Sequence, residues 1–252
     1  MRKFSTLLSR EIRSYFYSPI AYIVLVFFML LTGINFYLFE LSYMNQRPMD
    51  VSVMEVFFNN VLFWFPFVLV FPLITMRVFS EEFKLGTIEP LMSAPVRDWQ
   101  VVLAKYFGSL FFYIILWIPT ALYFVIFQAV AHQSAANSTG AYLGGYLMLL
   151  LLGMFYLSIG CFASVLTKNQ IVAAIISFAT ITLLFFLGLV SFVLLDVSSE
   201  TRQLLGYFSA IEQMRTLSRG VIDTRPMVLY LSMTIVMLTF TYQAFQTRKW
   251  RL

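Results

Sequence analysis

Residues 141–166 read AYLGGYLMLLLLGMFYLSIGCFASVL and contain no charged side chain and no histidine. About 20 consecutive apolar residues suffice for a helix that crosses the roughly 30 Å hydrocarbon core of a bilayer. Other stretches of the chain are comparably apolar and uncharged, and the alternation of apolar and polar residues that marks a membrane β-barrel is absent. The sequence therefore predicts an all-α polytopic membrane protein with six transmembrane helices, near residues 20–39, 56–76, 106–130, 141–166, 171–195 and 227–245.

The overall composition agrees with a membrane protein. Of the 252 residues, 60% are hydrophobic and 12% are charged, whereas soluble domains have about 45–50% apolar and about 25% charged residues. The core of a soluble domain of this size could not bury so much apolar surface, which excludes a soluble globular protein. Disordered chains have low hydrophobicity, so this composition also excludes a disordered protein. We therefore expect a single transmembrane domain over residues 1–252, without a separate soluble domain.

The distribution of the 17 Lys and Arg residues predicts the orientation in the membrane. Cytoplasmic loops of membrane proteins carry an excess of these residues. Six spans place both termini on one side, and that side carries all the basic residues except Arg47, Arg202, Arg215, Arg219 and Arg225. We therefore expect both termini in the cytoplasm. The net charge of +5 is then explained by basic residues at the cytoplasmic membrane surface and does not indicate nucleic-acid binding.

Three segments outside the spans are predicted to be helical. In residues 1–18, apolar side chains recur at helical spacing, mostly opposite the arginines, which indicates an interfacial amphipathic helix. The cytoplasmic loop 77–100 has acidic residues near a helix start and a glycine at a helix stop, so one or two short helices are expected there. The outer segment 196–226 has apolar residues at helical spacing and predicts an amphipathic or re-entrant helix.

The sequence lacks residues that several kinds of catalytic site need. No Gly-Lys pair occurs, so the phosphate-binding loop of ATPases is missing from this chain. One histidine and one cysteine exclude two-histidine zinc sites, cysteine clusters and histidine-dependent nucleophiles. We therefore expect a protein that is not an enzyme and binds no cofactor or metal itself. An enzyme acting on lipids is disfavoured because the predicted spans carry no charged or metal-binding cluster.

The fourth predicted span carries several glycines on one helical face. Gly140 and Gly144 form a G-x-x-x-G pair, and Gly145, Gly153 and Gly160 continue the same face. Small residues let transmembrane helices approach closely. The pattern therefore predicts a close contact, either with another helix of the same bundle or with a second subunit.

The cytoplasmic loop carries a recognisable motif. Residues 78–95, VFSEEFKLGTIEPLMSAP, resemble the signature between the second and third spans of ABC-2 type transporter permeases, where acidic residues are followed by Gly-Thr, an acid, Leu and Pro. The run SRGVID at residues 218–223 looks like the last extracellular segment of that family. The resemblance covers essentially the whole chain and implies a type V exporter-like ABC-2 permease fold. The chain is similar in particular to short permeases of gliding motility and of nitrous-oxide-reductase maturation.

The resemblance also implies partners and contact residues. In this family the loop couples the permease to a separate ABC ATPase subunit, which binds ATP and Mg²⁺. Such permeases act in pairs, so a second copy or a related permease is implied. Arg10 and Arg13 of the N-terminal helix would make polar contacts beside the same ATPase subunit. The residues implied at the coupling contact are Phe79, Glu81, Glu82, Gly86, Thr87, Glu89, Leu91 and Pro95.

Two functions are consistent with this resemblance. The first is the permease subunit of an ATP-driven exporter in a bacterial cytoplasmic (inner) membrane, for which the uncharged, aromatic-rich spans favour a lipidic or largely apolar cargo. The alternative is an ATPase-driven assembly or mechanotransmission component of an envelope machine, without vectorial transport of a solute. Motion would then act on an extracytoplasmic accessory protein through the outer segment, which contains the motif residues Arg219, Gly220 and Asp223.

Overall fold

The computed structural model describes residues 2–45, 57–58, 60–93, 96–131, 139–193, 206–221 and 223–249. Every regular element in these ranges is a helix, and six helices are long and apolar enough to cross a membrane. These observations confirm the all-α fold with six transmembrane helices. The six are α2 (Pro19–Asn45), α4 (Val61–Thr75), α7 (Asp98–Ala131), α8 (Thr139–Leu166), α9 (Gln170–Val193) and α12 (Thr224–Lys249).

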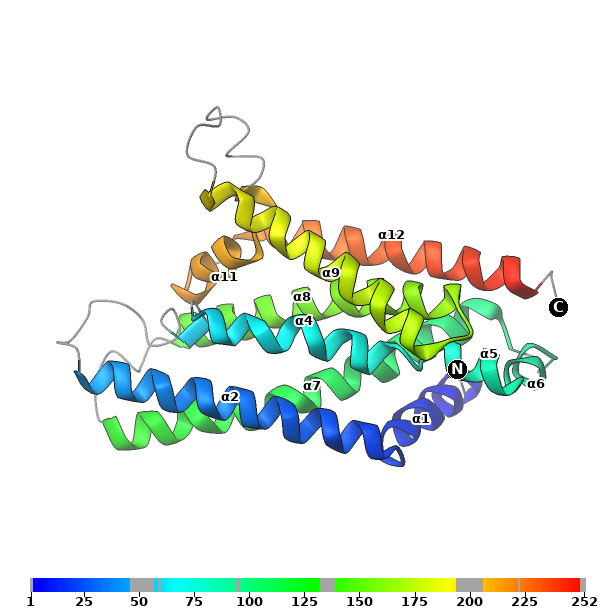
Figure 1. The fold of residues 1–252 in the computed structure, drawn as a ribbon, viewed down its shortest axis with the longest axis horizontal. Coiled ribbons are helices and arrows are strands. Elements are labelled where there is room, and N and C mark those ends of the chain that lie inside the picture. Colours follow the sequence, from blue (N-terminus) through cyan, green and yellow to red (C-terminus); the bar gives the residue numbers. More distant parts are fainter. Residues whose placement is uncertain are drawn as a thin grey trace.

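The shorter helices lie at the two ends of the bundle (Figure 1). The N-terminal helix α1 (Arg2–Phe16) lies at the same end as both chain termini, together with α5 (Ser80–Leu85) and α6 (Ile88–Ser93). Helix α11 (Ala210–Ser218) lies toward the opposite end, where it packs on α8 and α9. The end that holds α1, α5 and α6 is called the α5 end below.

Helix α8 is the central element, in contact with α4, α7, α9, α11 and α12. A methyl group added at Gly160 would come within 2.0 Å of the Thr75 hydroxyl oxygen, and one at Gly153 within 2.2 Å of a ring carbon of Tyr113. One at Gly144 would come within 2.1 Å of a backbone oxygen of α11. The predicted glycine face is therefore occupied by helices of the same chain.

Aromatic side chains fill much of the space between α4, α7 and the residues before α4. Phe63 lies 4.9 Å from Phe58 and 5.9 Å from Trp117, measured between ring centroids, and Phe67 lies 5.5 Å from Trp117. Helices in lipid gain little from apolar burial itself, so they associate through close van der Waals packing. Large rings in edge-on and tilted contacts provide that packing.

Two transmembrane helices begin earlier than the apolar pattern predicts. Helix α12 begins at Thr224 and runs to Lys249, and α7 begins at Asp98 and not near residue 106. Hydropathy marks only the apolar part of a helix, whereas hydrogen bonding continues through its polar turns. Lys105, which the predicted span bounds place in the connection before the third span, is instead inside α7 and buried, whereas the side of the membrane on which it lies stays a prediction.

Candidate functional site

The predicted cytoplasmic loop folds into α5, the turn at Gly86 and Thr87, and α6. Glu81 and Glu82 occupy the first turn of α5, where the helix dipole favours negative charge. The helix ends at Gly86, whose φ of 71° lies in the left-handed region that glycine adopts without strain. The side chains of Phe79, Ser80, Phe83, Ile88 and Leu91 are buried. Residues 84–87, called the tip below, are exposed, and Leu85 is 66% exposed.

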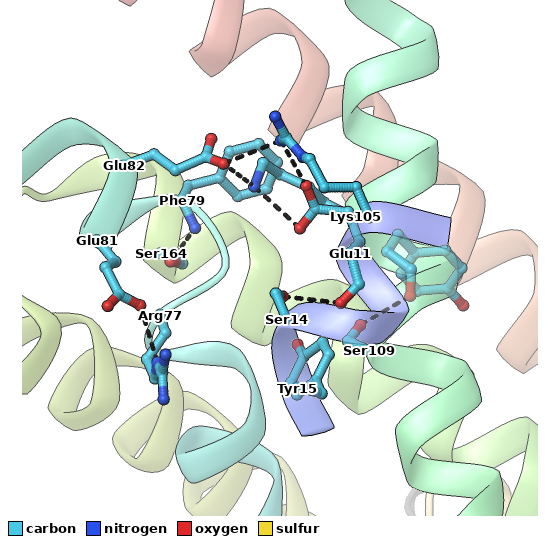
Figure 2. Close-up of polar contacts among 12 residues, drawn as sticks. Glu11, Ser14, Tyr15, Arg77, Phe79, Glu81, Glu82, Lys105, Ser109 and Ser164 are labelled. Atoms are coloured by element: carbon cyan, nitrogen blue, oxygen red, sulfur yellow. Dashed lines mark hydrogen bonds and ion pairs between the residues drawn. The ribbon is translucent and has the colours of Figure 1, made fainter. Parts of the chain in front are cut away.

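Four charged side chains from three helices meet beneath α5. Nζ of Lys105 on α7 lies 2.9 Å from Oε1 of Glu82 on α5 and 3.3 Å from Oε2 of Glu11 on α1. Arg10 on α1 lies 2.7 Å from Glu11 and 3.2 Å from Glu82. Figure 2 shows Glu11, Glu82 and Lys105 converging. Two cations balance two carboxylates, and these four residues are called the quartet below.

Burial makes the members of the quartet depend on one another. The Lys105 side chain is 2% exposed and that of Glu11 is 11% exposed, and a buried charge without a partner is costly. Burial alone would raise the pKa of the Glu11 carboxyl, but the Lys105 ammonium and the Arg10 guanidinium outweigh it, so this pKa lies below its usual value. The quartet therefore ties α1, α5 and α7 together through charge.

Ser164 of α8 provides a second attachment of α5. Its hydroxyl oxygen accepts hydrogen bonds from the backbone N–H groups of Phe79 (3.0 Å) and Ser80 (3.1 Å), and it donates to the carbonyl oxygen of Met76 at 3.3 Å. The first N–H groups of a helix have no partner within the helix. Ser164 therefore caps α5 from a transmembrane helix (Figure 2).

Ring–ring and cation–ring contacts attach the same segment to α12 and α7. The Phe79 ring lies 5.9 Å from that of Phe245, measured between centroids, and Lys105 Nζ lies 5.5 Å from the Phe79 centroid. The guanidinium carbon of Arg248 lies 4.8 Å from the centroid of Phe83. Both cations are within the distance at which a ring face attracts positive charge.

A separate ion pair lies beside the quartet. Arg77 Nε donates to Oε2 of Glu81 at 2.8 Å, and the same guanidinium donates to the hydroxyl of Ser18, which lies between α1 and α2. The Arg77 and Glu81 side chains are 25% and 34% exposed. Pairs this accessible to solvent contribute little to stability.

The structure places the sequence-predicted contact residues in different surroundings. Glu82 and Arg10 are brought together in the quartet, whereas Arg13 is exposed and lies outside it. The side chain of Glu89 and the whole of Pro95 lie outside the described residues. The contact of these residues with an ATPase stays a prediction.

Sequence reasoning missed Glu11, Lys105 and Ser164. Glu11 is an acid in an otherwise basic helix, and this signal could have indicated an intrachain partner. Lys105 directly precedes a predicted span, which is typical of a residue at the membrane surface. Ser164 gives no sequence signal, because a hydroxyl in a transmembrane helix usually bonds to the preceding turn, as that of Ser158 does to Phe155.

The outer motif residues have local structural roles. Gly220 has a φ of 82° and packs closely on the start of α8, where a methyl group would lie 3.4 Å from the backbone of Gly140. The Asp223 carboxylate accepts a hydrogen bond from the backbone N–H of Arg225 at 2.9 Å, at the start of α12. Arg219 follows α11 and is exposed. A role toward an accessory protein stays a prediction.

No metal-binding group was found within the described ranges, since nowhere in them do three or more His, Cys, Asp or Glu side chains gather in a suitable way. The polar residues of the α5 end pair with one another and form no such set of ligands. This arrangement attaches the surface segment α5 to the transmembrane helices.

Comparison with known proteins agrees with this architecture. The sequence model of a protein family described as 'ABC-2 family transporter protein' matches residues 5–250, which is nearly the entire chain. A search of the curated proteins finds no match. With its six apolar helices, the chain is a multi-pass membrane protein and belongs to the ABC-2 family of transporter proteins.

Proposed function

We propose that this chain is the permease subunit of an exporter in a bacterial inner membrane, driven by a separate ABC ATPase subunit that docks on the α5 end. Family membership supports a permease role in an ABC transporter. The ATPase would bind ATP and Mg²⁺, since this sequence has no phosphate-binding loop. The docking surface would face the cytoplasm, as would both termini, which lie at the same end of the bundle.

The observation that carries this proposal is the attachment of α5 to several transmembrane helices. Glu82 is bound to Lys105 of α7, the helix start is capped by Ser164 of α8, and Phe83 lies under Arg248 of α12. A force on α5 can alter the bundle only if the segment is attached to it, because coupling requires contacts whose free energy differs between two states. The attachments of α5 are the contacts through which such a force would act.

The tip, residues 84–87, is the part of the segment that the fold leaves available for a partner. Leu85 is 66% exposed although it is apolar, and Lys84, Gly86 and Thr87 are exposed beside it. Glu82 faces inward and would act as a positioning residue, whereas the tip would contact the ATPase. When two ATPase subunits close on ATP, they would push α5, and the bundles of two permease chains would rock to open a path between them.

Co-purification of the chain with its ABC ATPase partner tests the docking surface. Leu85→Asp is expected to lower recovery of the ATPase about tenfold and to leave the melting temperature of the permease unchanged, because the side chain makes little contact within the chain. Lys168→Asp is the matched control, since Lys168 is also exposed and lies between α8 and α9. Full recovery of an ATPase with normal turnover from Leu85→Asp would contradict the proposed docking site.

A vesicle assay tests whether ATP hydrolysis moves a substrate across the bilayer, and in which direction. The purified complex in sealed vesicles is expected to move an amphiphilic substrate across the bilayer only when ATP is present on the side of the ATPase. ATP hydrolysis that depends on the tip but moves no lipid or solute would favour the assembly or mechanotransmission role instead.

A further inference from the structure

Two cavities adjoin beside α2, and the side chains of Val24 and Leu73 line both of them. One cavity, of about 250 Å³, lies among α1, α2, α4 and α5, and its lining includes three carboxylates and one guanidinium. The other, of about 400 Å³, lies among α2, α4 and α9, and every side chain that lines it is apolar. We call them the head chamber and the tail groove. Ligand pockets usually measure about 300–1,000 Å³, so together they can hold an elongated molecule with one polar end.

We propose that the head chamber and the tail groove bind one zwitterionic phospholipid whose headgroup carries a primary ammonium, as phosphatidylethanolamine does. The order of the two cavities along the bundle matches the orientation of a lipid in the cytoplasmic leaflet. The polar chamber is lined by residues of α1 and α5, and the apolar groove is lined by residues of the transmembrane helices α2, α4 and α9.

The charges of the head chamber favour a neutral headgroup with two opposite charges. Glu11 and Glu82 line the chamber but are balanced by Lys105 and Arg10 within the quartet. The Arg77–Glu81 ion pair and Oε2 of Glu82, which is buried and has no hydrogen-bond partner among the described residues, are the charged groups left to meet a ligand. A phosphate would accept hydrogen bonds from the guanidinium, and an ammonium would donate to the carboxylate.

The hydrogen bonds of Glu81 select the kind of ammonium. Its Oε2 accepts from Arg77, and Oε1 of the same carboxylate, which belongs to a side chain that is 34% exposed, can accept a further hydrogen bond. A primary ammonium carries N–H donors for this oxygen, whereas the quaternary ammonium of phosphatidylcholine has none. An anionic headgroup such as that of phosphatidylglycerol would place unbalanced negative charge beside a carboxylate.

The tail groove has the chemistry of an acyl-chain site. Ala174 of α9 has a short side chain that leaves space between α9 and α4, and Pro72 and Leu73 line the facing wall. Ile23 and Ile175, which also line the groove, are 66% and 60% exposed. A hydrocarbon chain is therefore the occupant that the bilayer supplies and that this apolar lining accepts.

Native mass spectrometry of the purified full-length chain, titrated with lipids of identical acyl chains, tests the headgroup. Phosphatidylethanolamine is expected to remain bound at one molecule per chain, with an affinity about tenfold higher than that of phosphatidylcholine or phosphatidylglycerol, because the competitors lose a charge-assisted hydrogen bond. Equal retention of the three lipids would overturn the proposal. The measurement needs no ATPase, so its result does not depend on the proposed function.

Variants separate the groove from the chamber. Ala174→Trp fills the groove and is expected to lower retention of phosphatidylethanolamine at least tenfold, whereas Ala179→Trp, on the same helix but outside the groove, should bind as the wild type does. If Ala174→Trp fails to fold, Ile23→Trp fills the groove from α2. The double substitution Arg77→Gln with Glu81→Gln should keep the lipid but abolish the preference for its headgroup.

Two results of the variant experiment would overturn the proposal. One is unchanged retention of phosphatidylethanolamine in a folded Ala174→Trp protein. The other is a shift of the Ala174→Trp protein from dimer to monomer, which would show that a second copy of the chain covers the groove.

Discussion

Nζ of Lys105 lies 2.9 Å from Oε1 of Glu82, and this contact joins the transmembrane helix α7 to the short helix α5. The lysine side chain is 2% exposed, so it has almost no water to replace a lost carboxylate. If α5 moved alone, Lys105 would keep only Glu11 as a close partner. The two helices are therefore expected to move together.

Removal of the Lys105 charge should destabilise the protein. Lys105→Met leaves the carboxylates of Glu11 and Glu82 with only Arg10 to balance them. Breaking a fully buried ion pair costs about 3–5 kcal/mol, and the cost should be lower here because Glu82 is 20% exposed. Thermal unfolding in detergent measures the loss, with Lys168→Met as an exposed control. Equal melting temperatures for the two variants would show that the quartet contributes nothing.

Loss of the Ser164 hydroxyl should weaken the start of α5. Ser164→Ala removes the acceptor for two backbone N–H groups, and loss of a capping side chain costs about 0.5–2 kcal/mol. Ser158→Ala is the matched control, because Ser158 is also buried in α8 and its hydroxyl bonds only within that helix. In the complex, Ser164→Ala should reduce transport per ATP hydrolysed more than Ser158→Ala does. Identical ratios for both variants would argue against a coupling role for the cap.

Replacement of the closely packed glycines of α8 by larger residues should destabilise the helix bundle. Gly160→Ala places a methyl group 2.0 Å from the Thr75 hydroxyl oxygen, and overpacking of this kind costs about 1–3 kcal/mol. Gly33→Ala serves as the control, because its nearest neighbour outside its own helix would be the Tyr123 hydroxyl at 3.6 Å. The control should melt at or above the wild-type temperature, since alanine favours helix over glycine. A lower melting temperature for Gly33→Ala than for Gly160→Ala would contradict this packing.

The contribution of Glu11 should depend on pH. The pKa of this carboxyl is lower in the folded protein than its usual value of about 4.5, so the unfolded chain binds the proton more readily. The stabilisation is therefore fully present above that usual value and is lost as the pH falls through the lower, folded pKa. The melting temperatures of the wild type and Glu11→Gln should differ at pH 7 and converge in acid. A difference that stays constant down to pH 3 would exclude the carboxylate charge as its source.

The transmembrane helices could be predicted because each is long and apolar enough to be recognised alone, as residues 141–166 are. The two short helices of the α5 end could be expected from their acidic start and from Gly86. The quartet could not be predicted, because it joins residues 10, 11, 82 and 105. Only the folded bundle brings those residues together, with α1 packed on α7 and Glu82 of α5 within ion-pair distance of both, and the charge pattern of one segment does not reveal its partner in another.

The order of the quartet along the chain has a consequence for membrane insertion. Arg10, Glu11 and Glu82 all precede Lys105, so both carboxylates have left the ribosome before α7 does. Synthesis runs from the N-terminus, and early segments can fold first. When α7 enters the bilayer, the carboxylates of Glu11 and Glu82 can therefore already be at the membrane surface. Lys105 can pair with them at once, so the third span need not be inserted with an unpaired charge.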